Sequence, residues 1–141
     1  MNVLFIQKKR TFKFDKQNNE INRIIYKWDA DQKFFYVISK RNIEFKNGIL
    51  WSFERYRLNT EKKLVLYRKG NTEKDSKEKE IFVNYVLDNV TQRFIPAGKY
   101  QRTNVIDSQN KLVFSIETFD YDKNFNLWTL KDEYLEYLSK K

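Results

Sequence analysis

Alternation of hydrophobic and polar positions predicts that most of this chain forms β-strands. The first signals are an apolar run at Val3 to Ile6 and the alternation of Phe12 and Phe14 with polar neighbours. Further strands, rich in β-branched and aromatic residues, are predicted at residues 34–39, 41–45, 49–58, 64–68, 81–87, 94–95 with 100–105, and 112–121. Asn47-Gly48, between two of these strands, is the strongest hairpin signal in the chain.

Two segments have the period of an α-helix instead. The first spans about residues 19–29, where apolar side chains recur at i, i+3, i+4 and i+7: Ile21, Ile24, Ile25 and Trp28. The second spans about residues 129–140, where Thr129 and Asp132 form an acidic variant of the capping box ahead of an apolar stripe. The pattern therefore predicts an α+β fold, in which two helices pack on a curved, mainly antiparallel sheet of six to eight strands.

The length of the chain is that of one domain. Its 141 residues are 40% hydrophobic and include 12 Phe, 9 Tyr and 3 Trp, so we expect residues 1–141 to share a single core. Residues 70–79 have no apolar side chain, which predicts a mobile, charged loop at about residues 69–80. A domain linker is the rival interpretation, but each half would then have only about 60 to 70 residues.

The net charge of +9 comes entirely from the first half of the chain. Residues 1–70 hold 17 Lys and Arg against 7 Asp and Glu, whereas residues 71–141 hold 11 against 12. A basic half attracts anions, so the candidate partners are nucleic acid, an acidic protein or a membrane surface. A+T-rich coding would also enrich Lys, Asn and Ile, but such a bias acts along a whole gene and does not explain the asymmetry.

The absence of cysteine and histidine narrows the chemistry. Disulfides, thiolate catalysis and cysteine-based metal sites are excluded, and without histidine most hydrolase mechanisms are disfavoured. The pairs Asp29 with Asp31 and Asp120 with Asp122 lack the glycine and terminal glutamate of a calcium loop and suit turns. We therefore expect a non-catalytic binding protein with no catalytic residue, no cofactor and no metal. No apolar run is long enough to span a bilayer or to form a signal peptide, which predicts a cytoplasmic protein without membrane insertion.

One predicted strand combines aromatic and arginine side chains. The residues that share a face of strand 49–58 are Trp51, Phe53, Arg55 and Arg57. Such a face suits base stacking and phosphate contacts. The alternative is that Trp51 and Phe53 belong to the core and the arginines lie where the strand leaves it. Four basic residues near predicted turns complete the predicted partner site: Lys62, Lys63, Arg68 and Lys69.

A short segment resembles a known family. Ile95-Pro96-Ala97-Gly98-Lys99-Tyr100 is similar to the I-P-A-G-x-Y segment of GyrI-like effector-binding domains, and residues 133–137 are similar to the late Glu/Tyr segment of that family. The first half of the chain has no matching repeat, and the segment after Tyr100 is predicted to be a strand where the family has a helix. The resemblance implies a pocket for amphiphilic or cationic small molecules. Its residues are Tyr85, Tyr100, Glu133, Tyr134 and Tyr137.

Three functions remain open on these grounds. The leading hypothesis is that the basic, aromatic first half engages nucleic acid or a nucleoprotein assembly, with little sequence dependence because no base-reading motif is present. The second is a small-molecule binding domain of the GyrI-like kind. The third is an inhibitor or adaptor that docks on an acidic protein surface through arginine and tryptophan anchors.

Overall fold

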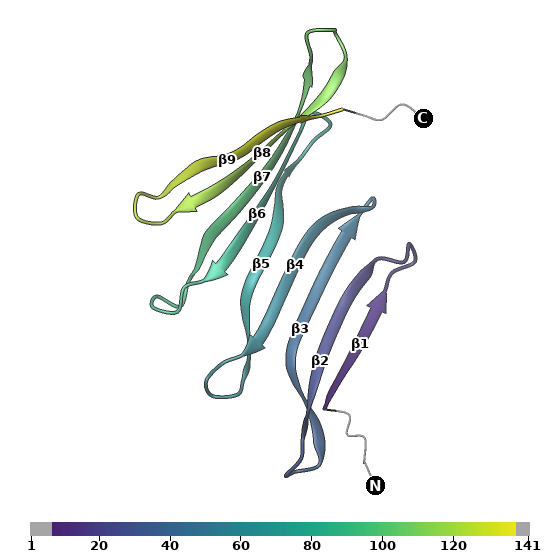
Figure 1. Ribbon diagram of the computed structural model, residues 1–141, viewed down its shortest axis with the longest axis vertical. Helices are drawn as coiled ribbons and strands as arrows, with labels where there is room; N and C mark the ends of the chain where they lie inside the picture. The colour runs from purple at the N-terminus through teal and green to yellow at the C-terminus, as the bar shows by residue number, and fades with distance from the viewer. Residues whose placement is uncertain (1–6, 138–141) are drawn as a thin grey trace. The chain divides into compact units, whose positions relative to one another are not determined.

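The computed structural model describes residues 7–137, and within this range it consists of β-strands and their connections, without a helix (Figure 1). The nine strands are β1 (Lys8–Phe14), β2 (Glu20–Asp29), β3 (Phe34–Lys46), β4 (Ile49–Leu58), β5 (Leu64–Asp75), β6 (Lys79–Leu87), β7 (Phe94–Ile106), β8 (Leu112–Asp122) and β9 (Leu127–Glu136). They form an antiparallel sheet in which the strand order follows the chain from β1 to β9.

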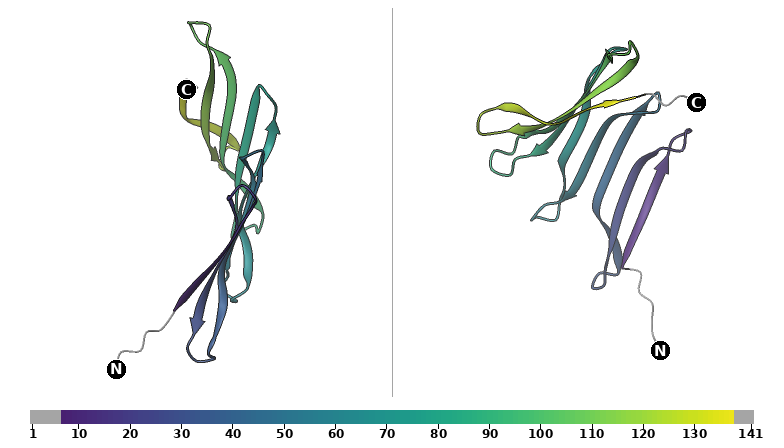
Figure 2. Two further views of the ribbon diagram at one scale, coloured as in Figure 1. Left: turned by 90° about the vertical axis from the view of Figure 1, so that its right-hand side faces the viewer. Right: turned by 45° about the horizontal axis from the view of Figure 1, so that its top comes forward.

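The chain divides into two compact units. Unit 1 comprises Met1–Lys69 and contains β1 to β4 and the first part of β5, whereas unit 2 comprises Gly70–Lys141 and contains the rest. Within each unit, neighbouring strands are joined by short turns and lie side by side, as both views of Figure 2 show. The boundary between the units lies within one residue of the boundary between the basic residues 1–70 and the charge-balanced residues 71–141. The single residue of difference, Gly70, is uncharged.

The predicted helix at residues 19–29 is wrong, because this segment is strand β2. Ile24, Tyr26 and Trp28 point to one face of the strand, and Arg23 and Ile25 point to the other. Most of β2 is only half-buried on either face, so apolar residues occur on both and imitate a helical stripe. Hydrogen-bonded pairing with β1 and β3 on its two sides satisfies the backbone of β2.

Two other predictions about secondary structure are wrong for related reasons. The helix at residues 129–140 is strand β9 as far as Glu136, and residues 138–140 lie outside the described range. The predicted loop at residues 69–80 is reduced to residues 76–78, since β5 continues to Asp75 and β6 begins at Lys79. Charged side chains are compatible with a strand whose faces are open to solvent. The α+β fold class is therefore corrected to all-β.

Most of the predicted strands are confirmed. Strand β4 has the predicted bounds, and the Asn47-Gly48 hairpin joins β3 to β4 with positive φ values of 52° and 76° at its two residues. The run at Val3 to Ile6 lies outside the described residues. Between the predicted strands 94–95 and 100–105, Pro96 lies next to a β-bulge within the continuous strand β7, where the pairing register with β6 shifts.

One type of turn recurs in both units. In the turns that begin at Asp15, Asn59 and Asp107, Oδ1 of the first residue accepts backbone N–H bonds from residues i+2 and i+4 at 2.8–2.9 Å. The residue at i+3 has a positive φ of 61° to 66°, and its N–H donates to the carbonyl of the first residue. At Asp15, the N–H donated by Asn19 holds the pKa of the carboxyl below its ordinary value of 3.8. This repeat is not recognisable in the sequence, because only two of its positions have a requirement. The first residue must supply a side-chain oxygen, and the residue at i+3 must adopt a positive φ.

The buried residues of the described range all lie in unit 2. The apolar ones are Phe82, Val83, Val113 and Ile116 on strands β6 and β8. Unit 1 has no buried residue among its described positions and keeps its apolar side chains half-exposed. Packing therefore stabilises the two units to different extents.

Candidate functional site

The strand register of unit 1 aligns three arginines. Arg23 on β2 lies directly opposite Arg41 on β3, and Arg41 lies directly opposite Arg55 on β4. Directly opposed residues have Cβ atoms about 5 Å apart, so like charges at these positions repel one another. We call Arg23, Arg41 and Arg55 the arginine row.

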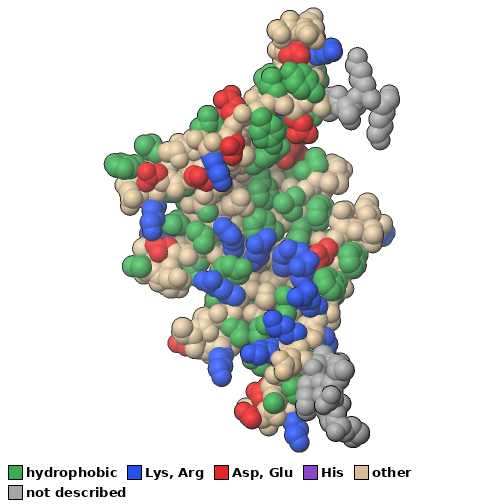
Figure 3. All heavy atoms as spheres, viewed as in Figure 1, with side chains coloured by type: hydrophobic (Ala, Val, Ile, Leu, Met, Phe, Trp, Pro, Cys, Tyr) green, Lys and Arg blue, Asp and Glu red, His purple; other side chains and the backbone are tan. Residues whose placement is uncertain are grey.

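Two more arginines point to the same side of the sheet. Arg10 lies two residues before Phe12, which pairs with Arg23, and Arg57 lies two residues after Arg55. Because side chains two positions apart share a face of a strand, both flank the row. The five residues form the arginine face of unit 1 and are five of the eight arginines in the chain. Lys and Arg side chains gather over β2 to β4 in Figure 3.

Aromatic rings accompany these arginines. The Cζ atom of Arg23 lies 5.3 Å from the ring centroid of Phe12, and that of Arg55 lies 5.4 Å from the ring centroid of Phe53. Arg57 is 4.5 Å from the ring centroid of Tyr67 on β5. These cation–π contacts hold guanidinium groups on the face without neutralising them.

Glu20 is the only acidic partner of the row within the described residues. Its carboxylate accepts two bonds from Arg23, at 2.6 and 2.9 Å, and one from Arg41, at 2.9 Å. The hydrogen bond from Arg23 and the charge of Arg41 hold the pKa of Glu20 below its ordinary value of 4.5, so it is ionised at neutral pH. The same pairing raises the pKa of Arg23. Three cations and one anion leave the row with a net charge of +2.

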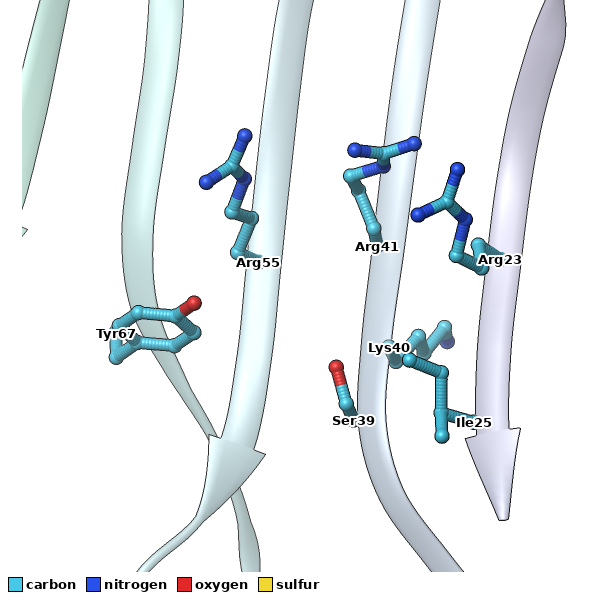
Figure 4. Close-up of a pocket in the computed structure, with 7 residues that line it drawn as sticks. All are labelled: Arg23, Ile25, Ser39, Lys40, Arg41, Arg55 and Tyr67. Carbon is cyan, nitrogen blue, oxygen red and sulfur yellow. The ribbon is translucent and has the colours of Figure 1, made fainter. Parts of the chain in front are cut away.

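Hydrogen-bond donors exceed acceptors at the row. The Arg55 guanidinium donates no hydrogen bond to any of residues 7–137, and the Nε atoms of Arg41 and Arg55 are buried without a partner there. A depression of about 170 Å³ lies at this position (Figure 4). Its lining comprises the row with Ile25, Ser39, Lys40 and Tyr67. A concave, donor-rich and cationic site of this kind suits an oxyanion.

The predicted partner residues are brought together only in part. Phe53, Arg55 and Arg57 share the arginine face, as expected from alternation along β4. Trp51 lies at a bulge of β4, with the Lys46 Nζ atom 4.1 Å from its ring centroid. Lys62 and Lys63 lie in a turn at the end of the hairpin between β4 and β5.

Arg68 and Lys69 are both on strand β5. Arg68 follows Tyr67 directly, so it points away from the arginine face, and its side chain is exposed. Lys69 lies one position further and is half-buried. Arg68 is therefore separated from the depression by the sheet itself.

The predicted ligand pocket is divided between two faces of unit 2. Tyr100 and Tyr134 share one face, because they lie opposite Thr118 and Ile116, which are two residues apart on strand β8. Tyr85 and Glu133 point to the other face, where the Tyr85 hydroxyl donates to the Glu73 carboxylate. Tyr137 follows the end of β9 and is exposed. A separate depression of about 320 Å³ beside Tyr100 and Gly98 includes none of the other four.

Among residues 7–137, no three acidic side chains converge as they would around a metal ion. The same range has no helix long and apolar enough to cross a membrane. The expectations of no metal, no cofactor and no catalysis stay predictions.

Sequence reasoning missed two members of the row. Arg23 lies within the predicted helix at residues 19–29, and Arg41 is only the first residue of the predicted strand 41–45. The signal that identifies them is the strand pairing, because Arg41 and Arg55 are equally distant from the Asn47-Gly48 turn once the bulge at Trp51 is allowed for. Glu20 could be found only after Arg23 was placed on a strand.

Comparisons with known proteins give a fold and no family. No protein-family model matches the chain, and no curated protein matches it. A solved structure of a protein of unknown function from Bacteroides fragilis is similar, with 14% identity, a TM-score of 0.61, and coverage of 92% of this chain and 91% of that chain. A DUF3836 family protein from Bacteroides vulgatus is 8% identical, with a TM-score of 0.45 over 65% of this chain and 92% of its own. The GyrI-like resemblance stays a prediction.

Proposed function

We propose that this protein is a non-catalytic binding protein whose arginine face engages single-stranded nucleic acid. The observation that supports the proposal best is the arginine row, in which three guanidinium groups share one carboxylate and repel one another across neighbouring strands. Such an arrangement lowers the stability of the free sheet and gains favourable contacts when a polyanion binds.

Single-stranded nucleic acid fits this face better than a protein partner does. Arginines bind the phosphate backbone, and the exposed Phe12 ring at one end of the row offers a surface on which a base can stack. An acidic protein surface would use the charges and leave this ring without a role. Because residues 7–137 contain no helix that could read base edges in a groove, we expect the binding to depend little on sequence.

The test is fluorescence anisotropy with labelled single-stranded and double-stranded DNA and RNA, at about 50 and 200 mM salt. We expect binding that is tightest for single strands and that weakens steeply with salt, by tenfold or more, as phosphate neutralisation requires. Arg55→Ala should reduce affinity by about tenfold, the effect of losing one desolvated charge contact.

Arg68→Ala is the matched control, because it removes the same charge from the same unit but on the other face. It should reduce affinity by no more than about twofold, since a charge on the far side contributes only through the screened field. Equal losses in the two variants would show non-specific attraction and would contradict the assignment to this face. No binding at 50 mM salt would reject nucleic acid as the partner.

A further inference from the structure

We propose that the arginine row is a subsite for a terminal phosphate monoester, so that the protein binds a nucleic acid strand at its phosphorylated end. This inference rests on the proposed function for the identity of the strand. The row itself supplies the preference for a monoester over an internal phosphodiester.

The first argument is charge balance. The three arginines and Glu20 leave a net charge of +2 at neutral pH. A phosphate monoester carries about −1.5 to −2 at pH 7, because its second pKa is near 6, whereas an internal phosphodiester carries one negative charge. The monoester therefore neutralises the row, and the diester leaves it with excess positive charge.

The second argument is the number and position of donors. Arginine binds phosphate through pairs of parallel N–H bonds, and a monoester offers three terminal oxygens where a diester offers two. The Arg55 guanidinium donates no hydrogen bond within the described residues, and the Arg41 guanidinium gives Glu20 only one. These two arginines are thus the ones available to a ligand, while Glu20 holds Arg23 in a bidentate pair.

The experiment compares two oligonucleotides of the same sequence, about 12 nucleotides long and labelled at the 3′ end, with a 5′-phosphate or a 5′-hydroxyl. We expect the phosphorylated strand to bind at least about tenfold more tightly, which corresponds to 1.4 kcal/mol. Arg55→Ala should abolish the preference, whereas Arg68→Ala should retain it. Because a strand also has a 3′ end, the pair is repeated with a 3′-phosphate and a 5′ label.

The outcomes separate this inference from the proposed function. Equal binding with and without phosphate at both ends would overturn the monoester subsite and leave nucleic acid binding intact. A preference that survives Arg55→Ala would place the subsite elsewhere and overturn the inference as well. If neither strand binds, calorimetry with phenyl phosphate decides: binding that Arg55→Ala removes supports the subsite without nucleic acid, and no binding rejects both.

Discussion

Unit 1 places arginines at three directly opposed positions across β2, β3 and β4, whereas unit 2 places Arg102, Ile116 and Tyr134 at three such positions across β7, β8 and β9. In unit 2 the arginine forms an ion pair with the buried Glu80, with Nη2 3.3 Å from Oε2, and lies over the ring of Phe114. The neighbouring isoleucine is fully buried. The same strand pairing thus carries three repelling arginines in unit 1, whereas in unit 2 it carries an ion-paired arginine, a buried isoleucine and an exposed tyrosine.

The comparison shows that the same antiparallel pairing occurs in both units with different side chains at the opposed positions. These side chains, and not the pairing, make one unit cationic and the other better packed. Unit 2 has the buried Ile116 at the central position of the three, and this burial stabilises the sheet. Unit 1 uses them for cations, whose mutual repulsion is a cost that natural proteins tolerate at binding sites. The proposed function therefore places binding in unit 1, while the buried residues make unit 2 the more tightly packed of the two.

The largest effect that can test this contrast is the loss of a buried side chain. Ile116→Ala should lower the free energy of unfolding by about 3 to 4 kcal/mol, because the residue is fully buried. Ile25→Ala, at a half-buried position of unit 1, should cost about 1 kcal/mol. Urea denaturation measures both values. Equal losses would show that unit 1 has a core of comparable importance.

The second test concerns two tyrosines, one from each unit. Burial, with the bond to Glu73 and its charge, raises the pKa of Tyr85 from 10.0 to about 12. Burial and Glu54 raise the pKa of Tyr56 in unit 1 as well. A raised pKa in the folded state contributes stability below pH 10, and this contribution is lost as the pH rises from 10 to 12.

Absorbance of the phenolate at 295 nm, measured as the difference between the wild type and Tyr85→Phe, should therefore show a midpoint near pH 12. The corresponding difference for Tyr56→Phe should also lie above pH 10. A midpoint of 10 for Tyr85 would mean that neither its burial nor its contact with Glu73 persists in solution.

The third test uses the turn that the two units share. Asn59→Ala in unit 1 and Asp107→Ala in unit 2 each remove an oxygen that accepts two backbone N–H bonds. Each substitution should lower the free energy of unfolding by about 1 kcal/mol, as for loss of a capping residue. Values that differ by more than about 0.5 kcal/mol would show that the turns are not equivalent.

The smallest expected effect is also the most diagnostic of repulsion. Arg55→Thr removes one charge of the row and introduces a β-branched residue that suits a strand. The free energy of unfolding should stay unchanged or rise by about 0.5 kcal/mol, because relief of like-charge repulsion offsets the lost contact with Phe53. A fall of 1 kcal/mol or more in urea denaturation would mean that Arg55 has a structural role.

Sequence reasoning predicted the strands better than the fold class. Asn47-Gly48 and the bounds of β4 could be predicted because the turn chemistry and the alternation agree there. Strand β2 could not, since both of its faces are half-buried and its isoleucines occur at helical spacing. A sheet that is open on both faces loses the alternation on which strand prediction depends.

The candidate site was predicted in part for the same reason. Arg55 and Arg57 were identified because they alternate along one strand. Arg23, Arg41 and Glu20 belong to the site through pairing between strands, and this register depends on the bulges in β2, β3 and β4. Single-sequence periodicity contains no information about such bulges.

The most direct test of the central claim is an NMR titration of the ¹⁵N-labelled protein with a single-stranded oligonucleotide at low salt. The account predicts that amide shifts concentrate at Arg23, Arg41 and Arg55 and their strand neighbours, with little change across β6 to β8. Shifts centred on unit 2, or absent at saturating oligonucleotide, would contradict the assignment of binding to the arginine face.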